Sequence, residues 1–240
     1  MTRVAIMQPT YLPWMGYFSL IDKVDVFIFL DSVQFAKRSW QQRNKIKTAN
    51  EPIWLTVPIL SKGKSSQLIS EVEIDCSRKF PEKHISSIEF NYHMAPFFSR
   101  YSPELFSILQ KKHRYLVDLT IELIEWICCE IGIITPIRRS SMMENTGTKA
   151  DLLAMLCEQV NATEYMSPPG SRDYLDESNA FQNRGIAVTY HDYIHPEYRQ
   201  LYGDFIPYMS VIDLLFNLGA ESRNVLKSGC HISSPGEIKN

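Results

Sequence analysis

Residues 3–32, RVAIMQPTYLPWMGYFSLIDKVDVFIFLDS, predict the class of fold. Two short apolar runs rich in β-branched residues, 3–7 and 24–30, enclose residues 15–23, which are long enough for about two turns of helix. The order strand, loop, helix, strand is typical of a βαβ unit, in which the two strands are parallel. We therefore expect an open α/β sheet in which the loop after each strand lies at the carboxyl edge, where such folds bind ligands.

The rest of the chain continues the alternation. Residues 54–60 and 70–75 are extended and separated by a polar turn, which predicts a hairpin, and residues 78–131 have helical periodicity. The last hundred residues alternate again, with expected strands at 133–141, 164–170 and 186–193 and expected helices at 148–162, near 171–184 and at 210–220.

This pattern predicts an α/β fold with a Rossmann-like, mostly parallel sheet, helices on both faces and a helical insertion in the middle. We expect a single domain over residues 1–225, with the hairpin and helical insertion at about 54–131. Residues 226–240 are expected to form a flexible tail.

Composition restricts the function. The chain has 240 residues, with 25 Lys and Arg against 27 Asp and Glu, so its net charge is −2. Nucleic acid is not expected as the main partner, because binding it requires a surplus of cations facing phosphates. The five cysteines show no CxxC spacing and are expected to be reduced thiols. We expect no signal peptide and no direct membrane insertion, and hence a cytoplasmic location.

The loop after the first strand, QPTYLPW, carries two prolines that restrict its backbone. Gln8, Tyr11 and Trp14 present amide and aromatic groups to the expected ligand crevice. The alternative is that Tyr11 and Trp14 merely cap the sheet edge.

The loop after the second strand, DSVQFAKRSWQQRN, combines cations with amides and an indole. Arg offers a planar fork to phosphate, amides read ring edges, and Trp40 offers a stacking face, which together suit a nucleotide or a phosphorylated sugar. A solvated charged surface is the alternative. The expected ligand-binding residues of this loop are Asp31, Lys37, Arg38, Trp40, Arg43 and Asn44.

A third strand end, RRSSMMENTGTK, places Ser140 and Ser141 after a strand and Lys149 at the start of a helix. Free amides at a helix N-terminus attract anions, and Lys149 adds a mobile positive charge. Thr148 with Asp151 also resembles a helix-capping box, and the two roles are compatible.

The loop after the last strand predicts acid–base chemistry. His195 is a candidate general base, with Tyr198 and Gln200 as substrate-binding neighbours, and His84 is a second candidate base. His191 with Asp192 and His195 also permits a metal site in principle, although the spacing supplies no clear third ligand, and no metal is expected. The chain contains no GxGxxG, GxxxxGK[ST], GxSxG or HExxH motif.

Taken in order, several segments resemble the WbqC-like protein family over essentially the whole chain: QPTYLPWMGYFSLI, DVFIFLDSVQFAKRSWQQRNKIK, WLTVPI, KHISSI, APFF, SS followed by GTKADLL, HPEYRQL and GDFIPYMSVIDLLFNLG. This resemblance implies a role in O-antigen or other surface-polysaccharide biosynthesis. The opening segment also resembles, more faintly, pantothenate synthetase and related nucleotidylyltransferase folds. Where those enzymes carry the histidines of an HxGH motif, this chain has Leu12 to Tyr17 without a histidine.

These observations lead to one main hypothesis and two alternatives. The main one is a transferase that attaches an acyl or aminoacyl group to a nucleotide-linked amino sugar, with Lys37, Arg38 and Arg43 holding the diphosphate and His195 or His84 removing the amine's proton. The alternatives are nucleotidyl or adenylyl transfer, and a non-catalytic protein that binds a sugar nucleotide or serves as a scaffold. A homo-oligomer is possible, and the sequence specifies no cofactor. Convergence of Gln8 with Lys37, Arg38 and His195 on one cleft would favour an enzyme over a scaffold.

Overall fold

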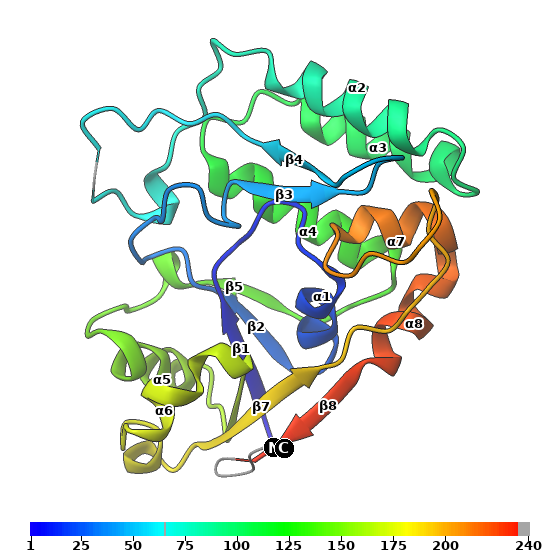
Figure 1. The fold of residues 1–240 in the computed structure, drawn as a ribbon. Coiled ribbons are helices and arrows are strands. Elements are labelled where there is room, and N and C mark those ends of the chain that lie inside the picture. Colours follow the sequence, from blue (N-terminus) through cyan, green and yellow to red (C-terminus); the bar gives the residue numbers. More distant parts are fainter. Residues whose placement is uncertain (65, 235–240) are drawn as a thin grey trace.

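A computed structural model describes residues 1–64 and 66–234. Its centre is a six-stranded sheet in the order β5-β2-β1-β6-β7-β8, in which all neighbouring strands are parallel except the antiparallel pair of β7 and β8 (Figure 1). The chain therefore runs outward from β1 in one direction and then returns to its other side, which is the Rossmann-like arrangement. The strands are β1 (Arg3–Met7), β2 (Val26–Phe29), β5 (Ile137–Arg139), β6 (Glu164–Ser167), β7 (Ala187–Tyr193) and β8 (Cys230–Ser233).

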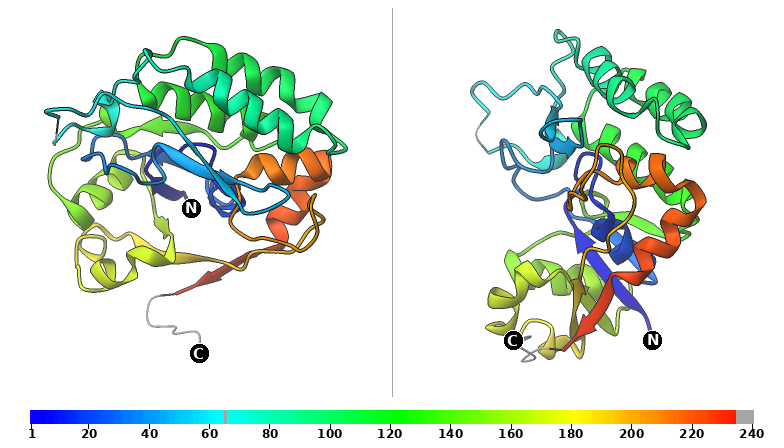
Figure 2. Two further views of the ribbon diagram at one scale, coloured as in Figure 1. Left: turned by 45° about the horizontal axis from the view of Figure 1, so that its top comes forward. Right: turned by 45° about the vertical axis from the view of Figure 1, so that its right-hand side comes forward.

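Helices cover both faces of the sheet, as predicted (Figures 1 and 2). Ala5 and Phe27 face one core, whereas Val4 and Ile28 face the other, because side chains alternate along a strand. The first core packs on α1 (Met15–Asp22), α4 (Leu116–Glu130), α7 (Val211–Leu218) and α8 (Ser222–Ser228), and the second on α5 (Lys149–Gln159) and α6 (Arg172–Asp176).

The connection from β2 to β5 contains the predicted insertion. It comprises a two-stranded sheet of β3 (Arg43–Ile46) and β4 (Ile53–Thr56), followed by α2 (Phe80–Tyr92), α3 (Phe98–Gln110) and α4. The hairpin lies beyond the carboxyl ends of β1 and β2 (Figure 1). Two hydrogen bonds join the hairpin and the residues just before it to the loop after β1. One is a backbone bond from Tyr11 N to Trp40 O, and the other runs from the side chain of Asn44, Nδ2, to Leu12 O.

The position of the hairpin differs from the sequence prediction. The segments 54–60 and 70–75 meet only at the antiparallel bridge of Ile59 with Ile74, whereas residues expected to form a loop make β3. Because residues 43–46, RNKI, include two cations, they were predicted to be a loop. They form a strand in which Asn44 and Ile46 are buried and Arg43 and Lys45 lie on the other face. Alternation of side chains, rather than hydrophobicity, is the strand signal here.

The carboxyl-terminal part also differs. Of the expected helix near 171–184, only α6 is α-helical, and short 3-10 turns lie on either side of it. Of the expected tail from residue 226, the described residues complete α8 and form β8, which pairs with β7. Leu226 and Ser233 are buried, so this segment closes the edge of the sheet, and residues 235–240 lie outside the described residues. The five cysteines are free thiols.

Candidate functional site

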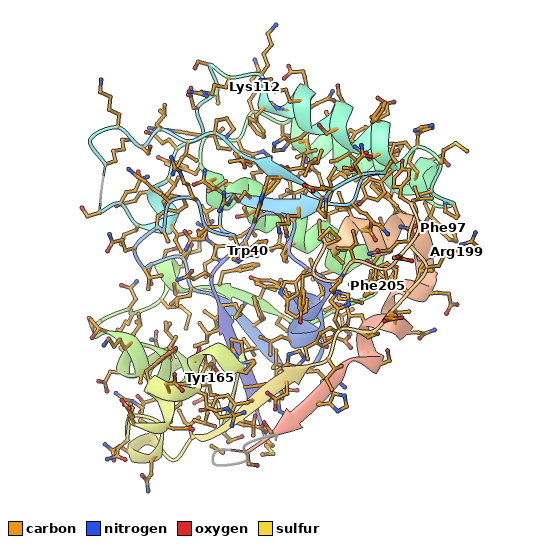
Figure 3. The ribbon with its side chains drawn as sticks, in the orientation of Figure 1. Trp40, Phe97, Lys112, Tyr165, Arg199 and Phe205 are labelled. Carbon is orange, nitrogen blue, oxygen red and sulfur yellow. The ribbon has the colours of Figure 1, made fainter. Side chains whose placement is uncertain are left out.

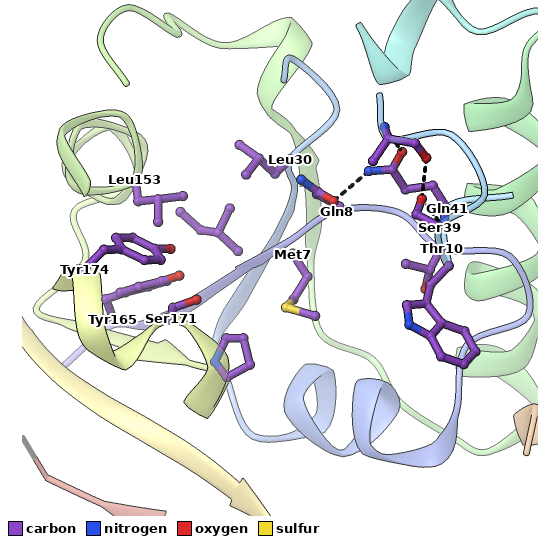
Figure 4. A pocket seen from close by; sticks show the side chains of 14 residues that line it. Met7, Gln8, Thr10, Leu30, Ser39, Gln41, Leu153, Tyr165, Ser171 and Tyr174 are labelled. Atoms are coloured by element: carbon purple, nitrogen blue, oxygen red, sulfur yellow. Dashed lines mark hydrogen bonds between the residues drawn. The ribbon is translucent and has the colours of Figure 1, made fainter. Parts of the chain in front are cut away.

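A cavity lies where the neighbours of β1 diverge, at the carboxyl end of the sheet. Its volume is about 340 Å³, and residues from the ends of β1, β2 and β6 line it together with the loop that leads into β3 (Figure 4). This is the topological switch point, because the chain reaches β2 and β6 on opposite sides of β1. The lining includes Met7, Gln8, Thr10, Leu30, Ser39, Trp40, Gln41, Leu153, Tyr165, Ser171 and Tyr174.

A second cavity, of about 310 Å³, adjoins the first. Met7, Thr10 and Trp40 line both, so the two cavities are adjacent, and we refer to them together as the crevice. The second cavity is largely aromatic, and none of the described residues that line either cavity carries a formal charge. The remaining lining residues are Pro13, Trp14, Tyr17, Asn44 and Tyr208.

Two glutamines organise the first cavity. Gln41 Nε2 donates to Gln8 Oε1 at 2.7 Å, and the backbone N–H of Ala36 donates to Gln41 Oε1 at 3.0 Å (Figure 4). Since the oxygen of Gln8 is occupied by Gln41, its amide nitrogen is the group available to a ligand. The structure thus brings Gln8 and Trp40 together in the crevice, as predicted from two separate loops.

Trp14 covers the start of α1 instead of leaving it open. A Cβ atom on Gly16 would lie 2.3 Å from the Trp14 indole, so the absence of a side chain allows the ring to lie on the helix backbone. The start of this helix therefore carries an indole and no cationic side chain. The arrangement suits ring stacking better than the binding of a triphosphate.

The cations of the second loop point elsewhere. Lys37 Nζ donates to the Ser61 carbonyl at 3.1 Å, and the Arg43 guanidinium lies 4.2 Å from the centre of the Trp54 ring. Arg38 has a left-handed backbone, with φ of +58°, and is exposed between residues that line the first cavity. Neither cavity is lined by these three cations, and Arg38 is the one adjacent to the crevice in sequence.

Asp31, Ser140 and Ser141 form a junction between the ends of β2 and β5, in which Asp31 and Ser140 are buried and Ser141 is exposed. Asp31 accepts from Arg139 Nε at 2.8 Å, from Ser141 Oγ at 2.7 Å and from Ser140 Oγ at 3.1 Å. Ser140 Oγ in turn accepts from the Asp31 backbone N–H at 3.0 Å. Sequence analysis correctly placed these groups at neighbouring strand ends, but they bind one another and line neither cavity.

Tyr11 and His84, predicted as a ligand-binding and a catalytic residue, form a buried pair. The Tyr11 hydroxyl and His84 Nδ1 are 2.8 Å apart, and the other side of the imidazole bonds to the Thr56 backbone. Burial lowers the pKa of His84 to about 4, so its ring is neutral at pH 7. The pair joins α2, β4 and the loop after β1, and lines neither cavity.

His195 lies behind the wall of the second cavity. Its ring stacks on Trp14 with centroids 5.9 Å apart and contacts Tyr208 edge-on at 5.3 Å. Nδ1 is 3.0 Å from the Pro196 carbonyl oxygen, which requires the proton on Nδ1 and leaves Nε2 as an acceptor. Partial burial lowers the pKa of His195, which favours the neutral imidazole at pH 7.

Tyr198 and Gln200, the expected neighbours of His195, belong to a buried network around Asp213. Tyr198 and Tyr92 each donate from the hydroxyl to Asp213 at 2.8 Å. Gln200 accepts from Lys47 Nζ at 3.1 Å, and these bonds hold the segment 194–208 against β3 and α7. Neither predicted residue lines the crevice.

Lys149 is exposed, with φ of +50°, and Thr148 makes no side-chain capping bond to α5, so the expected capping role is not observed. His191 is buried and bonds to Ser19 at 3.0 Å rather than to a metal-ligand partner. Within residues 1–64 and 66–234, no group of three or more His, Cys, Asp or Glu side chains is arranged to hold a metal ion.

Several crevice residues were not predicted. Ser171 and Tyr174 follow β6, at the start of the helix expected near 171–184, and Tyr208 precedes α7. The signal that could have pointed to two of them is the expected strand ending in SPPG, because a third loop at the carboxyl edge has to approach the first two. Tyr208 lies in a long loop, and its position follows from tertiary packing alone.

Comparison with known proteins supports the resemblance seen in the sequence. The model of the WbqC-like protein family matches residues 8–225. This chain belongs to the WbqC-like protein family. It is also 42% identical over 229 residues to the uncharacterized protein Rv1507c of Mycobacterium tuberculosis (strain ATCC 25618 / H37Rv), an alignment that covers 95% of this chain and 98% of that relative. No solved structure matches this WbqC-like chain. None of its helices, over the described part of the chain, is long and apolar enough to cross a bilayer.

Proposed function

We propose that this WbqC-like protein binds a nucleotide-linked amino sugar in the crevice and transfers an acyl or aminoacyl group to its amine during surface-polysaccharide assembly. The observation that carries this proposal is the pair of adjacent, uncharged cavities at the switch point of the sheet, both lined by Trp40. Ligand pockets of this kind are mostly apolar, with a few polar groups that fix orientation.

The two cavities divide the ligand between them. The nucleoside occupies the first, where Gln8 presents its amide nitrogen to a ring edge and Trp40 offers a stacking surface. The sugar occupies the second, between Trp14, Tyr208 and Trp40, whose rings pack against its C–H faces. The phosphates then lie at the exposed rim near Arg38, because the cavities themselves contain no cationic lining.

The transfer step forms an N–C bond and breaks the bond between the acyl carbon and its leaving group. The amine attacks an activated ester or thioester, the leaving group departs, and the amine loses one proton. His195 is the proposed base, because Nε2 is the acceptor nitrogen and the ring is neutral. His195 contacts Trp14 and Tyr208, which line the second cavity, and Tyr208 is 53% exposed, so a rotation of the Tyr208 side chain would open His195 to the amine.

Binding is tested by thermal unfolding of the wild type, Trp40→Ala and Trp54→Phe in the presence of nucleotides and nucleotide-linked amino sugars. A ligand present at about one hundred times its Kd adds about 2.7 kcal/mol to the free energy of unfolding. We expect a shift for the wild type and Trp54→Phe and a much smaller one for Trp40→Ala. If no nucleotide-linked sugar raises the unfolding temperature of the wild type, the proposal fails.

Catalysis is tested separately by mass spectrometry of the sugar after incubation with activated acyl donors. His195→Ala should bind the sugar nucleotide like the wild type but form product at least a hundredfold more slowly, since positioned acid–base groups contribute this much. Equal turnover by the two proteins would eliminate His195 as the base.

A second candidate is a non-catalytic protein that binds a sugar nucleotide. It is favoured by the failure of Lys37, Arg38 and His195 to join Gln8 in lining the cavities. Stabilisation by a nucleotide-linked sugar without product from any activated acyl donor would establish this candidate over the transferase.

A further inference from the structure

The outer face of the β3–β4 hairpin carries an exposed group of aromatic and basic side chains. Lys45 pairs with Trp54 across the strands, and Arg43 lies two residues away on the same face. Arg43 and Lys45 lie 4.2 and 4.9 Å from the centre of the Trp54 ring, and Trp40 contacts the same ring at 5.2 Å. We name Trp40, Arg43, Lys45 and Trp54 the hairpin face.

Both indoles of the hairpin face are open to solvent. Trp40 is 50% exposed and Trp54 is 41% exposed, whereas the inward neighbours Asn44 and Leu55 are buried. Among the residues that the structure describes, no helix lies in front of the hairpin in the view of Figures 1 and 3. Exposure of large apolar rings to water is unfavourable, and two exposed tryptophans in contact are typical of a surface that binds another molecule or a membrane.

The charge around the hairpin face is strongly one-sided. Residues 32–64 contain seven Lys and Arg against one acid, Glu51, a net charge of +6 in a chain whose total is −2. Arg38, Arg43, Lys45 and Lys62 have no carboxylate partner among the described residues, whereas Lys64 pairs with Glu73. A partner must therefore be negatively charged and extended enough to meet several cations.

We propose that the hairpin face docks the protein on the surface of an anionic lipid bilayer. Tryptophan is favoured at the membrane–water interface, and Lys and Arg beside it are attracted to anionic headgroups. Single-stranded nucleic acid is a poorer match, because Arg43 and Lys45 lie over the Trp54 ring and compete with a base for its stacking face, although 41% of Trp54 is exposed. Docking uses side chains only and requires no membrane-spanning helix.

Docking also explains a connection within the molecule. Trp40 belongs to the hairpin face and lines both cavities of the crevice. The mouth of the crevice therefore lies beside the docked surface, so a substrate or product held at a membrane could reach it. The docking proposal itself does not depend on the reaction in the crevice.

The test is co-sedimentation of the full chain with vesicles of phosphatidylcholine alone or mixed in equal parts with phosphatidylglycerol. The wild type should bind the mixed vesicles, with partitioning that falls as salt rises and a blue shift of tryptophan emission. Lys45→Ala should weaken partitioning about fivefold, the share expected of one cation near an anionic surface. Trp54→Ser should lose most of the binding and the blue shift.

Matched controls lie on another part of the chain. Phe90 is 78% exposed on α2, and Lys112 is exposed after α3, so Phe90→Ser and Lys112→Ala remove an equivalent apolar group and an equivalent charge. Both should bind mixed vesicles like the wild type. Lys45→Arg should also bind normally, which separates a loss of charge from a loss of structure.

Three outcomes would overturn the proposal. The first is no binding of the wild type to mixed vesicles, and the second is equal weakening in the Phe90 and Lys112 controls. The third is displacement from vesicles by millimolar glycerol 3-phosphate, which would indicate a site for a small free anion. Thermal shifts with nucleotide-linked sugars should be unchanged in Trp54→Ser, so the failure of docking and the failure of sugar-nucleotide binding are distinguishable.

Discussion

The crevice and the hairpin face share Trp40, yet they differ in chemistry. The crevice is lined by neutral residues, and its glutamines bond to each other and to the backbone. The hairpin face, in contrast, presents cations without carboxylate partners beside exposed indoles. A single stretch of sequence, RSWQQRNKIK, supplies both, because alternation along β3 sends neighbouring residues to opposite sides.

The amides, the indole and the cations of this stretch were predicted to form one binding site, but they lie in two regions. The amides and one indole serve the interior of the crevice, and the cations serve the exterior. The largest expected effects come from breaking the structure that supports both regions, and the smallest from changing a charge at the rim.

Replacement of Asp31 by Ala should have the largest effect. It removes the acceptor of four hydrogen bonds, from Arg139 Nε, Ser140 Oγ and the N–H and Oγ of Ser141, and leaves Arg139 partly buried without its closest partner. Breaking a buried ion pair in this way costs about 3–5 kcal/mol in the free energy of unfolding, measurable by urea denaturation. The folded variant should bind nucleotide-linked sugars normally; a selective loss of affinity at unchanged stability would return Asp31 to the binding site.

Acid should weaken the connection between the two regions. His84 joins β4 to the loop after β1, and its folded pKa of about 4 lies below the usual 6.5, so the unfolded chain takes up its proton first. The free energy of unfolding is therefore unaffected by the titration of this histidine above pH 6.5 and falls as the pH falls, by about 2 kcal/mol at pH 5. His84→Gln should flatten the pH dependence of urea unfolding, and the exposed His93→Gln should not.

Replacement of Trp40 by Ala affects both regions. Loss of one aromatic stacking partner for a base costs about 1–3 kcal/mol, or roughly ten- to a hundredfold in Kd for a nucleotide-linked sugar. Isothermal titration of Trp40→Ala and Trp40→Phe should show a loss in the first and near-complete retention in the second. Equal affinities for wild type and Trp40→Ala would separate the indole from the nucleotide.

Replacement of Arg38 by Ala should have the smallest effect on ligand affinity. As an exposed cation at the rim, it should contribute about 1 kcal/mol to phosphate binding, which is roughly a fivefold change in Kd that shrinks at high salt. Arg38→Lys should retain most of it, and Arg38→Ala should lose it. Salt-independent weakening in the alanine variant would indicate a change in the left-handed turn rather than in charge.

The sequence predicted the parts of this molecule that depend on local patterns. The strands β1, β2, β5, β6 and β7, the helices α1 and α4, and the carboxyl-edge location of residues 8–14 follow from periodicity and from the βαβ rule. Of the predicted binding residues, those that line the crevice are Gln8, Trp14, Trp40 and Asn44, from the two loops that follow β1 and β2.

The rest depends on contacts between distant segments. The partner of Tyr11 is His84, 73 residues away in the sequence, and Tyr198 bonds to Asp213. Residues whose chemistry would suit catalysis or ligand binding therefore make structural hydrogen bonds instead. The hairpin was misplaced because Arg43 and Lys45 gave a strand the composition of a loop. The sequence shows that this segment is cationic, but only the tertiary structure shows on which face of the strand the cations lie.

The most direct test of the central claim is a crystal structure of the protein with a bound nucleotide-linked amino sugar. We expect the nucleoside in the cavity beside Gln8 and Trp40, the sugar between Trp14 and Tyr208, and the phosphates at the rim by Arg38. A ligand held instead by Arg43 and Lys45 on the hairpin face, with the crevice empty, would contradict that claim.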